Sequence, residues 1–224
     1  MIKIIFQVVK ISLPVLFGYI AIGMPFGIMM IAAGYPFWLV PLMSIVIYAG
    51  AGQYMAVGLF AVGAGLSEIL FAEALLNMRH IVYGLPLIES YKNAGKWKPY
   101  IIFALTDETY ALLTTCNVPA GIKSGTFYGL ISLFNHIYWI AGGVLGAIAV
   151  SIIPISFKGV DFALTALFAV LLIEQIKKTK SFLPLVIGAI VTITAIIFIP
   201  SKNILLFSIC FGIVALMIFR RDNA

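Results

Sequence analysis

Four polar residues interrupt an apolar part of the chain within the stretch EALLNMRHIVYG: Glu73, Asn77, Arg79 and His80. Their carboxylate, amide, guanidinium and imidazole groups could bind a charged solute or exchange protons. On one continuous helix Glu73, Asn77 and His80 would form a stripe with Gly84, whereas Arg79 would point to another face. The structural alternative is that Arg79 extends towards a surface or holds a neighbouring helix. We interpret Asn77, Arg79 and His80 as candidate substrate contacts.

A second polar stretch, LTDETYAL, places Asp107 and Glu108 side by side. One interpretation is a helix start, with Thr106 or Asp107 as the N-cap and Glu108 near the positive end of the helix. The other makes one acid the counter-ion of Arg79 or a proton carrier, because burial favours the neutral form of a carboxyl group. The two interpretations are compatible, and Asp107 and Glu108 are predicted to take part in proton coupling.

Three further polar residues lie inside apolar runs: Gln53 in YAGAGQY, and Asn135 and His136 in FNHIYW. A lone histidine in such a run is most often a packing residue, but it titrates near neutrality and can relay protons. We therefore predict Gln53 and Asn135 as substrate contacts and His136 as a proton-coupling residue. Asp161, at the start of a later apolar run, is predicted to cap a helix.

Helix-breaking residues also lie within the apolar runs, notably Gly23, Pro25 and Gly27 in GYIAIGMPFG and Gly50 and Gly52 in YAGAGQY. Small residues often allow close helix packing in membranes. A proline between two glycines also indicates unwound backbone, which transporters use to hold polar substrate groups. Pro25 is therefore predicted to belong to the substrate site.

The composition defines the class of protein. Of 224 residues, 63% are hydrophobic and 10% are charged, and the mean hydropathy is +1.15. A soluble protein would be about one quarter charged, so the chain is predicted to be an integral membrane protein of the all-α class. The net charge of +6 comes from short basic clusters at the ends of apolar runs, which indicates membrane topology rather than nucleic-acid binding.

The chain is predicted to be a single transmembrane domain over residues 1–224, and its polar and Pro/Gly residues divide it into seven or eight membrane segments. The segment at 101–116 is short and could cross the membrane or re-enter it. Counts of Lys and Arg satisfy the positive-inside rule in both cases, and both place FRRDNA in the cytoplasm. The predicted segments are 13–34, 37–62, 64–88, 101–116, 126–153, 160–176, 181–200 and 203–219.

A weak internal similarity, FGYIA at 17–21 and YGLIS at 128–132, raises the possibility of an inverted repeat. Cys116 and Cys210 have neither disulfide nor metal-site spacing, and the sequence contains no recognised catalytic motif. We therefore expect no enzyme activity, no metal and no cofactor.

Five stretches in this order resemble the AzlC family, the large subunit of branched-chain amino acid exporters: GYIAIGMPFGIMM, SIVIYAGAGQY, LNMRHIVYGLPL, LTDETYAL and VDFALTALFAVLL. The resemblance implies a multi-pass protein of the prokaryotic cytoplasmic membrane. It also implies export of valine, leucine, isoleucine and sometimes methionine, driven by an ion gradient, together with a small AzlD-like membrane subunit. A channel or carrier for another small solute or ion, and a non-transporting scaffold, are the alternatives.

Overall fold

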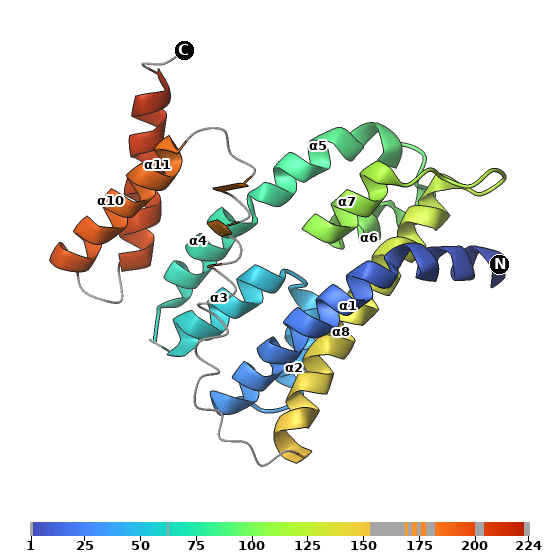
Figure 1. The fold of residues 1–224 in the computed structure, drawn as a ribbon, viewed down its shortest axis with the longest axis horizontal. Coiled ribbons are helices and arrows are strands. Elements are labelled where there is room, and N and C mark those ends of the chain that lie inside the picture. The colour runs from blue at the N-terminus through green and yellow to red at the C-terminus, as the bar shows by residue number, and fades with distance from the viewer. Residues whose placement is uncertain are drawn as a thin grey trace. The chain divides into compact units, whose positions relative to one another are not determined.

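The computed structural model describes residues 2–61, 63–152, 182–199 and 204–221, with Ala169, Leu172, Ile173, Ile176 and Lys177. Every regular element among these residues is helical, which confirms the all-α class (Figure 1). The elements are α1 (Ile2–Ala32), α2 (Leu39–Val46), α3 (Gly50–Ala61), α4 (Leu66–Asn77), α5 (Arg79–Tyr91), η1 (Gly95–Trp97), α6 (Lys98–Phe103), α7 (Asp107–Thr115), α8 (Ser124–Ile152), α10 (Leu183–Phe198) and α11 (Ile204–Arg221).

Two of the described helical stretches, Lys3–Ala32 and Ser124–Val150, are long and apolar enough to cross a membrane by themselves. The full count of seven or eight segments stays a prediction. Most of the segment at 160–176 lies outside the described residues, as does Asp161.

The chain divides into two compact units, residues 1–57 with 76–161 and residues 58–75 with 162–224. In the second unit, α10 packs against α11. All the residues of the site described below belong to the first unit. A single permease domain over residues 1–224 stays a prediction.

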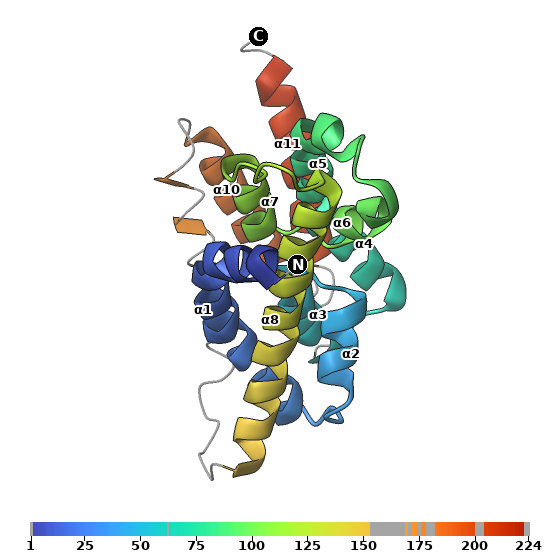
Figure 2. The ribbon, with the colours of Figure 1, turned by 90° about the vertical axis from the view of Figure 1, so that its right-hand side faces the viewer.

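Helices α1 and α8 lie side by side, as both views show (Figures 1 and 2). Their backbones touch because glycines face each other along the contact. A Cβ atom on Gly27 would collide with the backbone of Gly143 and Ala147, and one on Gly146 with the backbone of Met24. Close packing by small residues is therefore the role of this part of the glycine-rich first span.

Helix α1 continues without interruption through Pro25 to Ala32. The prediction of unwound backbone at Pro25 is therefore wrong. A proline removes one backbone donor, but membrane helices tolerate it where neighbouring helices and small local adjustments compensate. Pro25 thus offers no free helix end to a substrate.

The residues in contact show that α1 and α8 run in the same direction. Tyr19 lies against Gly142, and further along both helices Gly27 lies against Ala147. An inverted repeat would make these two helices antiparallel, so that prediction is wrong for the pair carrying the FGYIA and YGLIS stretches. Parallel helices require an odd number of membrane crossings between them. The predicted topology in which residues 101–116 cross the membrane would provide this odd number.

Three of the predicted segments are each divided into two helices. The breaks lie at residues 47–49 between α2 and α3, at Met78 between α4 and α5, and at residues 104–106 between α6 and α7. At the second break Ile81 N–H donates to the carbonyl of Met78 at 3.0 Å, a tight i→i+3 turn. The predicted continuous helix with one polar stripe over residues 73–84 is therefore wrong.

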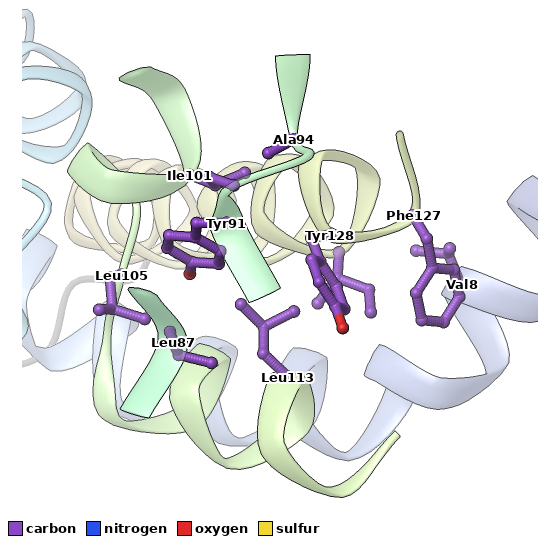
Figure 3. Close-up of a cluster of buried hydrophobic side chains, with 10 residues drawn as sticks. Val8, Leu87, Tyr91, Ala94, Ile101, Leu105, Leu113, Phe127 and Tyr128 are labelled. Carbon is purple, nitrogen blue, oxygen red and sulfur yellow. The ribbon is translucent and has the colours of Figure 1, made fainter. Parts of the chain in front are cut away.

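A buried apolar cluster fixes the relative positions of the helices that carry the site (Figure 3). It joins α1, α5, α6, α7 and α8, and within it the rings of Tyr91 and Tyr128 lie 6.3 Å apart. Such dense packing holds membrane helices together, because lipid itself is apolar. The cluster consists of Val8, Leu87, Tyr91, Ala94, Ile101, Leu105, Leu113, Phe127, Tyr128 and Ile131.

Candidate functional site

Two consecutive residues of α8, Asn135 and His136, contact the helices that adjoin the breaks between α2 and α3 and between α6 and α7. Asn135 donates from Nδ2 to Thr109 Oγ1 in α7 at 2.9 Å. The ring of His136 lies between α2 and α6, with Nε2 3.1 Å from the Ser44 carbonyl and Nδ1 3.0 Å from the Tyr100 hydroxyl. Because a carbonyl only accepts, Nε2 carries the hydrogen, and Nδ1 of the neutral ring accepts from Tyr100. Asn135 and His136 thus connect α2, α6 and α7 through one face of α8.

Tyr48 forms the break between α2 and α3. Its φ of +45° lies in the left-handed region, which is uncommon for a bulky residue and marks a strained site. Its ring stacks on that of His136, with ring centroids 4.1 Å apart. The buried hydroxyl interacts by side-chain hydrogen bonding with Tyr19 and Thr109, although neither contact meets strict hydrogen-bond geometry.

Gln53 lies just after this break and holds the indole of Trp139. The indole Nε1 donates to Gln53 Oε1 at 2.8 Å, and Gln53 Nε2 donates to Ser44 Oγ at 3.4 Å. Gly50 lies against the same indole, because a Cβ atom there would press on the ring. All these contacts are buried, so Gln53 positions Trp139 beside the break. Its predicted contact with substrate stays a prediction.

The Gln53–Trp139 pair gives a first testable prediction. Gln53→Leu should lower the free energy of unfolding by about 1–3 kcal/mol, because the buried indole N–H loses its acceptor. The double variant Gln53→Leu/Trp139→Phe removes both polar partners and should recover part of this loss. Thermal unfolding in detergent measures both effects. A single variant as stable as the wild type would show that another acceptor replaces Gln53.

The N-terminus of α7 is capped as one of the two interpretations of LTDETYAL predicts. Thr106 is the N-cap, and its Oγ1 accepts from the backbone N–H of Thr109 at 3.2 Å. Asp107 and Glu108 occupy the first turn, where the helix dipole favours negative charge. The break at residues 104–106 therefore ends in a well-formed helix start that carries two acids.

Glu108 is linked to α1 by a hydroxyl group. Tyr19 donates to Glu108 Oε2 at 2.8 Å, and its hydroxyl also lies 2.7 Å from Thr106 Oγ1. Thr106 Oγ1 in turn lies 3.0 Å from Thr109 Oγ1. Because Tyr19, Thr106 and Thr109 are buried, this chain of oxygen atoms connects Glu108 to the interior of the first unit.

Asp107 is the counter-ion of Arg79, as the other interpretation of LTDETYAL predicts. Arg79 Nη1 lies 2.7 Å from Asp107 Oδ2, and the two side chains are 28% and 39% exposed. The contact uses one atom from each group. Arg79 Nε and Asp107 Oδ1 are buried atoms without a hydrogen-bond partner among the described residues. Tyr83 and Tyr110 stack beside the pair, with ring centroids 5.0 Å apart.

His80 faces a different environment from its neighbour Arg79. It lines an apolar groove of about 480 Å³ on α5 and α6, while it also interacts electrostatically with Arg79 and Asp107. Asn77 is the last residue of α4 and is partly buried. Among the described residues no group of three His, Cys, Asp or Glu side chains could hold a metal ion. The groove is lined by His80, Ile81, Gly84, Leu85, Ile88, Tyr91, Lys98, Ile102 and Leu105.

Several hydroxyl groups and one indole that complete the site were not predicted from the sequence. Four of these six residues carry a common signal, because tyrosine and tryptophan inside apolar segments need partners for their polar atoms. Searching each apolar run for such residues would have identified most of them. The missed residues are Tyr19, Ser44, Tyr48, Tyr100, Thr109 and Trp139.

Comparison with known proteins places these features in a family. Residues 14–153 match the AzlC protein family. The chain is 35% identical to a membrane protein of Helicobacter pylori, over 80% of this chain and 79% of that protein. It is also 35% identical to the branched-chain amino acid transport protein AzlC of Bacillus subtilis, over 70% of this chain and 61% of that protein.

A membrane protein of Haemophilus influenzae is 30% identical over 74% of this chain and 68% of its own length. No solved structure matches the chain. The predicted membrane location is confirmed by these relatives, and the expectation that the chain is not an enzyme is confirmed by its similarity to a transport protein. The matched region covers more than half of the sequence, and the chain therefore belongs to the AzlC family.

Proposed function

We propose that this chain is the large subunit of a secondary transporter that exports valine, leucine, isoleucine and related hydrophobic amino acids. The observation that carries the proposal is the single-contact ion pair of Arg79 and Asp107. It leaves one buried donor, Arg79 Nε, and one buried acceptor, Asp107 Oδ1, without a partner of strict hydrogen-bond geometry among the described residues, and the Tyr83 hydroxyl interacts with Asp107 beside them. An amino acid zwitterion supplies the matching groups, because its carboxylate accepts and its ammonium donates.

In this proposal the substrate carboxylate binds Arg79 and its ammonium binds Asp107, so the pair keeps its overall charge balance when the substrate enters. The aromatic rings of Tyr83 and Tyr110 provide an apolar surface beside the pair for the substrate side chain. The two helix breaks around α8 add polar backbone within the same unit, a feature that transporters use near their substrates. Gln53 and Asn135 support these breaks.

The similarity to the branched-chain amino acid transport protein of Bacillus subtilis supports the choice of substrate. Export, proton coupling and a small AzlD-like membrane subunit complete the proposal and rest on the family resemblance. Glu108, half-buried and bonded to Tyr19, is the acid that remains for coupling once Asp107 neutralises Arg79.

Competition in proteoliposomes tests the zwitterion site. The full chain is reconstituted with its small partner subunit, and transport of radiolabelled leucine is measured against three competitors: unlabelled leucine, isocaproate, which lacks the ammonium, and isoamylamine, which lacks the carboxylate. Each analogue loses one charged hydrogen bond and should compete roughly 10- to 150-fold less well than leucine. Equal competition by isocaproate would contradict the role of Asp107, and equal competition by isoamylamine that of Arg79. Reconstitution without the small subunit should give no transport.

A further inference from the structure

Helices α5 and α7 run in the same direction, so the chain between them turns back on itself. Arg79 pairs with Asp107, and further along both helices Tyr83 stacks on Tyr110. Helix α6 starts where α5 ends, after a short connection through η1. Because α7 is parallel to α5, it ends on the side of the first unit where α6 starts. The segment at 98–115 therefore enters and leaves at one end.

Contacts with α8 locate this end and the depth of the turn. A Cβ atom on Gly125, near the start of α8, would collide with the backbone of Ala94, in the connection before α6. The ring of Phe103, at the end of α6, lies 6.0 Å from that of His136. Leu113 of α7 is back in the apolar cluster, beside the first turns of α8 (Figure 3). This segment thus reaches the middle of α8 and returns to its N-terminal end.

The segment with α2 and α3 approaches the middle of α8 from the other end. A Cβ atom on Gly143 would lie 3.2 Å from the side chain of Val40, near the start of α2. Tyr48, at the following break, stacks on His136, which is closer to the N-terminal end of α8. Helix α2 therefore runs antiparallel to α8 and ends at the level where α6 also ends.

Helix α3 then turns back towards the C-terminal end of α8. Tyr54 donates to the carbonyl of Ile22, and its ring lies 5.9 Å from that of Phe26 in α1. This part of α1 packs on the C-terminal half of α8, where Gly27 meets Ala147. A helix continuing in the direction of α2 would have carried Tyr54 the opposite way. The segment with α2 and α3 therefore also turns back at its break.

The lysines support this arrangement. All those of residues 1–152 lie in the first part of α1, in the connection of α5 to the start of α6, or just before α8, and the contacts place these parts at the N-terminal end of α8. The positive-inside rule assigns this end to the cytoplasm. If residues 98–115 crossed the membrane, the same lysines would be divided equally between its two sides. They are Lys3, Lys10, Lys92, Lys96, Lys98 and Lys123.

His136 joins the tips of the two turned segments. Its Nε2 donates to the Ser44 carbonyl of α2, and its Nδ1 accepts from the Tyr100 hydroxyl of α6. The hydroxyl of Tyr48 also interacts with Thr109 of α7, across the two tips. His136, Ser44 and Thr109 are buried, so the tips meet in the interior of the first unit.

We propose that both segments are re-entrant hairpins, one entering from the cytoplasm and the other from the opposite side, and that the closed barrier of the transport route lies where their tips meet at His136. Of the predicted segments between α1 and α8 only 64–88 then crosses, which is again an odd number. Asp107 lies in the first turn after the cytoplasmic tip, so the substrate site adjoins the barrier. Transporters commonly bind substrates where discontinuous helices meet near the bilayer midplane. The hairpins stand on the contacts alone, whereas the barrier rests on the proposed function.

Thiol labelling of membrane vesicles tests the hairpins without any transport. Cys116→Ala and Cys210→Ala remove the native thiols, and a membrane-impermeant maleimide is applied to right-side-out and to inside-out vesicles that contain the full chain and its small partner subunit. Asn93→Cys and Asn117→Cys, at exposed positions before α6 and after α7, should both react only from the cytoplasmic face. Reaction of either variant from the opposite face would overturn the cytoplasmic hairpin.

The same vesicles test the other hairpin. Ala33→Cys and Ser67→Cys introduce thiols at exposed positions before α2 and in the first turn of α4. Both should react only from the face opposite to the cytoplasm, because α2 and α3 enter and leave there. If Ser67→Cys reacted from the cytoplasmic face, α2 and α3 would cross the membrane and this hairpin would be wrong.

The barrier is tested by the reactivity of a buried thiol. Ser44 is fully buried, so Ser44→Cys should react slowly with a water-soluble thiol reagent. Adding His136→Phe keeps an aromatic ring but removes two hydrogen bonds, which should raise the rate roughly 5- to 150-fold. The matched control is Tyr138→Phe, which removes a hydroxyl of α8 that bonds Ser12 and should leave the rate unchanged. Equal rates with the two substitutions would overturn the barrier. If the wild type moves no branched-chain amino acid, the proposed function fails, whereas the labelling still decides the hairpins.

Discussion

Arg79→Gln is expected to reduce leucine transport at least about a hundredfold while leaving the amount of protein in the membrane near that of the wild type. The substitution removes the proposed partner of the substrate carboxylate, and a loss of about 3 kcal/mol corresponds to this factor. It also leaves Asp107 without its counter-ion. Transport of radiolabelled leucine into proteoliposomes, normalised to reconstituted protein, measures the effect.

A double variant separates the roles of the pair in stability and in binding. Asp107→Asn combined with Arg79→Gln removes both charges, so it should be more stable than either single variant, because no unpaired charge remains. The pair is partly exposed, which places the stability difference near the low end for ion pairs, about 1 kcal/mol. Transport should stay absent in the double variant. Wild-type transport by this variant would remove Arg79 and Asp107 from the substrate site.

Gly27→Ala is expected to prevent stable packing of α1 on α8. A Cβ atom at this position would collide with backbone atoms of Gly143 and Ala147, which cannot rotate away as a side chain can. Overpacking of this kind costs about 1–3 kcal/mol, and more where the backbone must move. Alanine also has a better helix propensity than glycine, but this difference stabilises the helix by less than about 1 kcal/mol. A clear fall in melting temperature in detergent and a lower yield of folded protein should result.

The same helix provides a matched control. Gly18 lies in α1, and a Cβ atom there would meet no other group within 4 Å. Gly18→Ala should therefore leave the melting temperature unchanged or raise it slightly, since alanine favours the helix. If both alanine variants behaved alike, contact between the α1 and α8 backbones would not limit stability.

The sequence predicted the class of protein and part of the site. The scarcity of charge required a membrane protein, and opposite charges in two apolar stretches made an Arg79 ion pair with one of two acids a reasonable alternative. The choice of Asp107 could not be made from sequence. It depends on the direction in which two adjacent side chains leave the first turn of α7, one towards α5 and the other towards α1.

The positions of the helix breaks were harder to predict. Pro25 is the stronger helix-breaking residue in isolation, yet α1 continues through it, because contact with α8 stabilises the helix on both sides. The break between α2 and α3 instead occurs at Tyr48, a residue type with no tendency towards left-handed backbone. It is held there by packing on His136, which is distant in sequence. Local signals were present at Thr106, a helix cap, and in the glycines of YAGAGQY, which directly follow the break at Tyr48.

The error in the polar stripe has a similar cause. A single tight turn at Met78 changes the phase of the helix, so residues on either side no longer follow one period of 3.6. Arg79 and His80 are neighbours in sequence, but the structure directs one to Asp107 and the other to the apolar groove. Periodicity identifies a face only as far as the helix is continuous.

The glycine contact between α1 and α8 also constrains how the protein is made. Gly27 and Gly143 are separated by 143 − 27 = 116 positions, and a ribosome adding about 5–20 residues per second needs roughly 6–23 s to synthesise this interval. During that time α1 has entered the bilayer but its partner has not yet been translated. Its flat glycine face must then contact lipid, the insertion machinery or another nascent chain. Helix α1 therefore acquires its final neighbour late, and synthesis of α8 sets the earliest time at which the first unit can assemble.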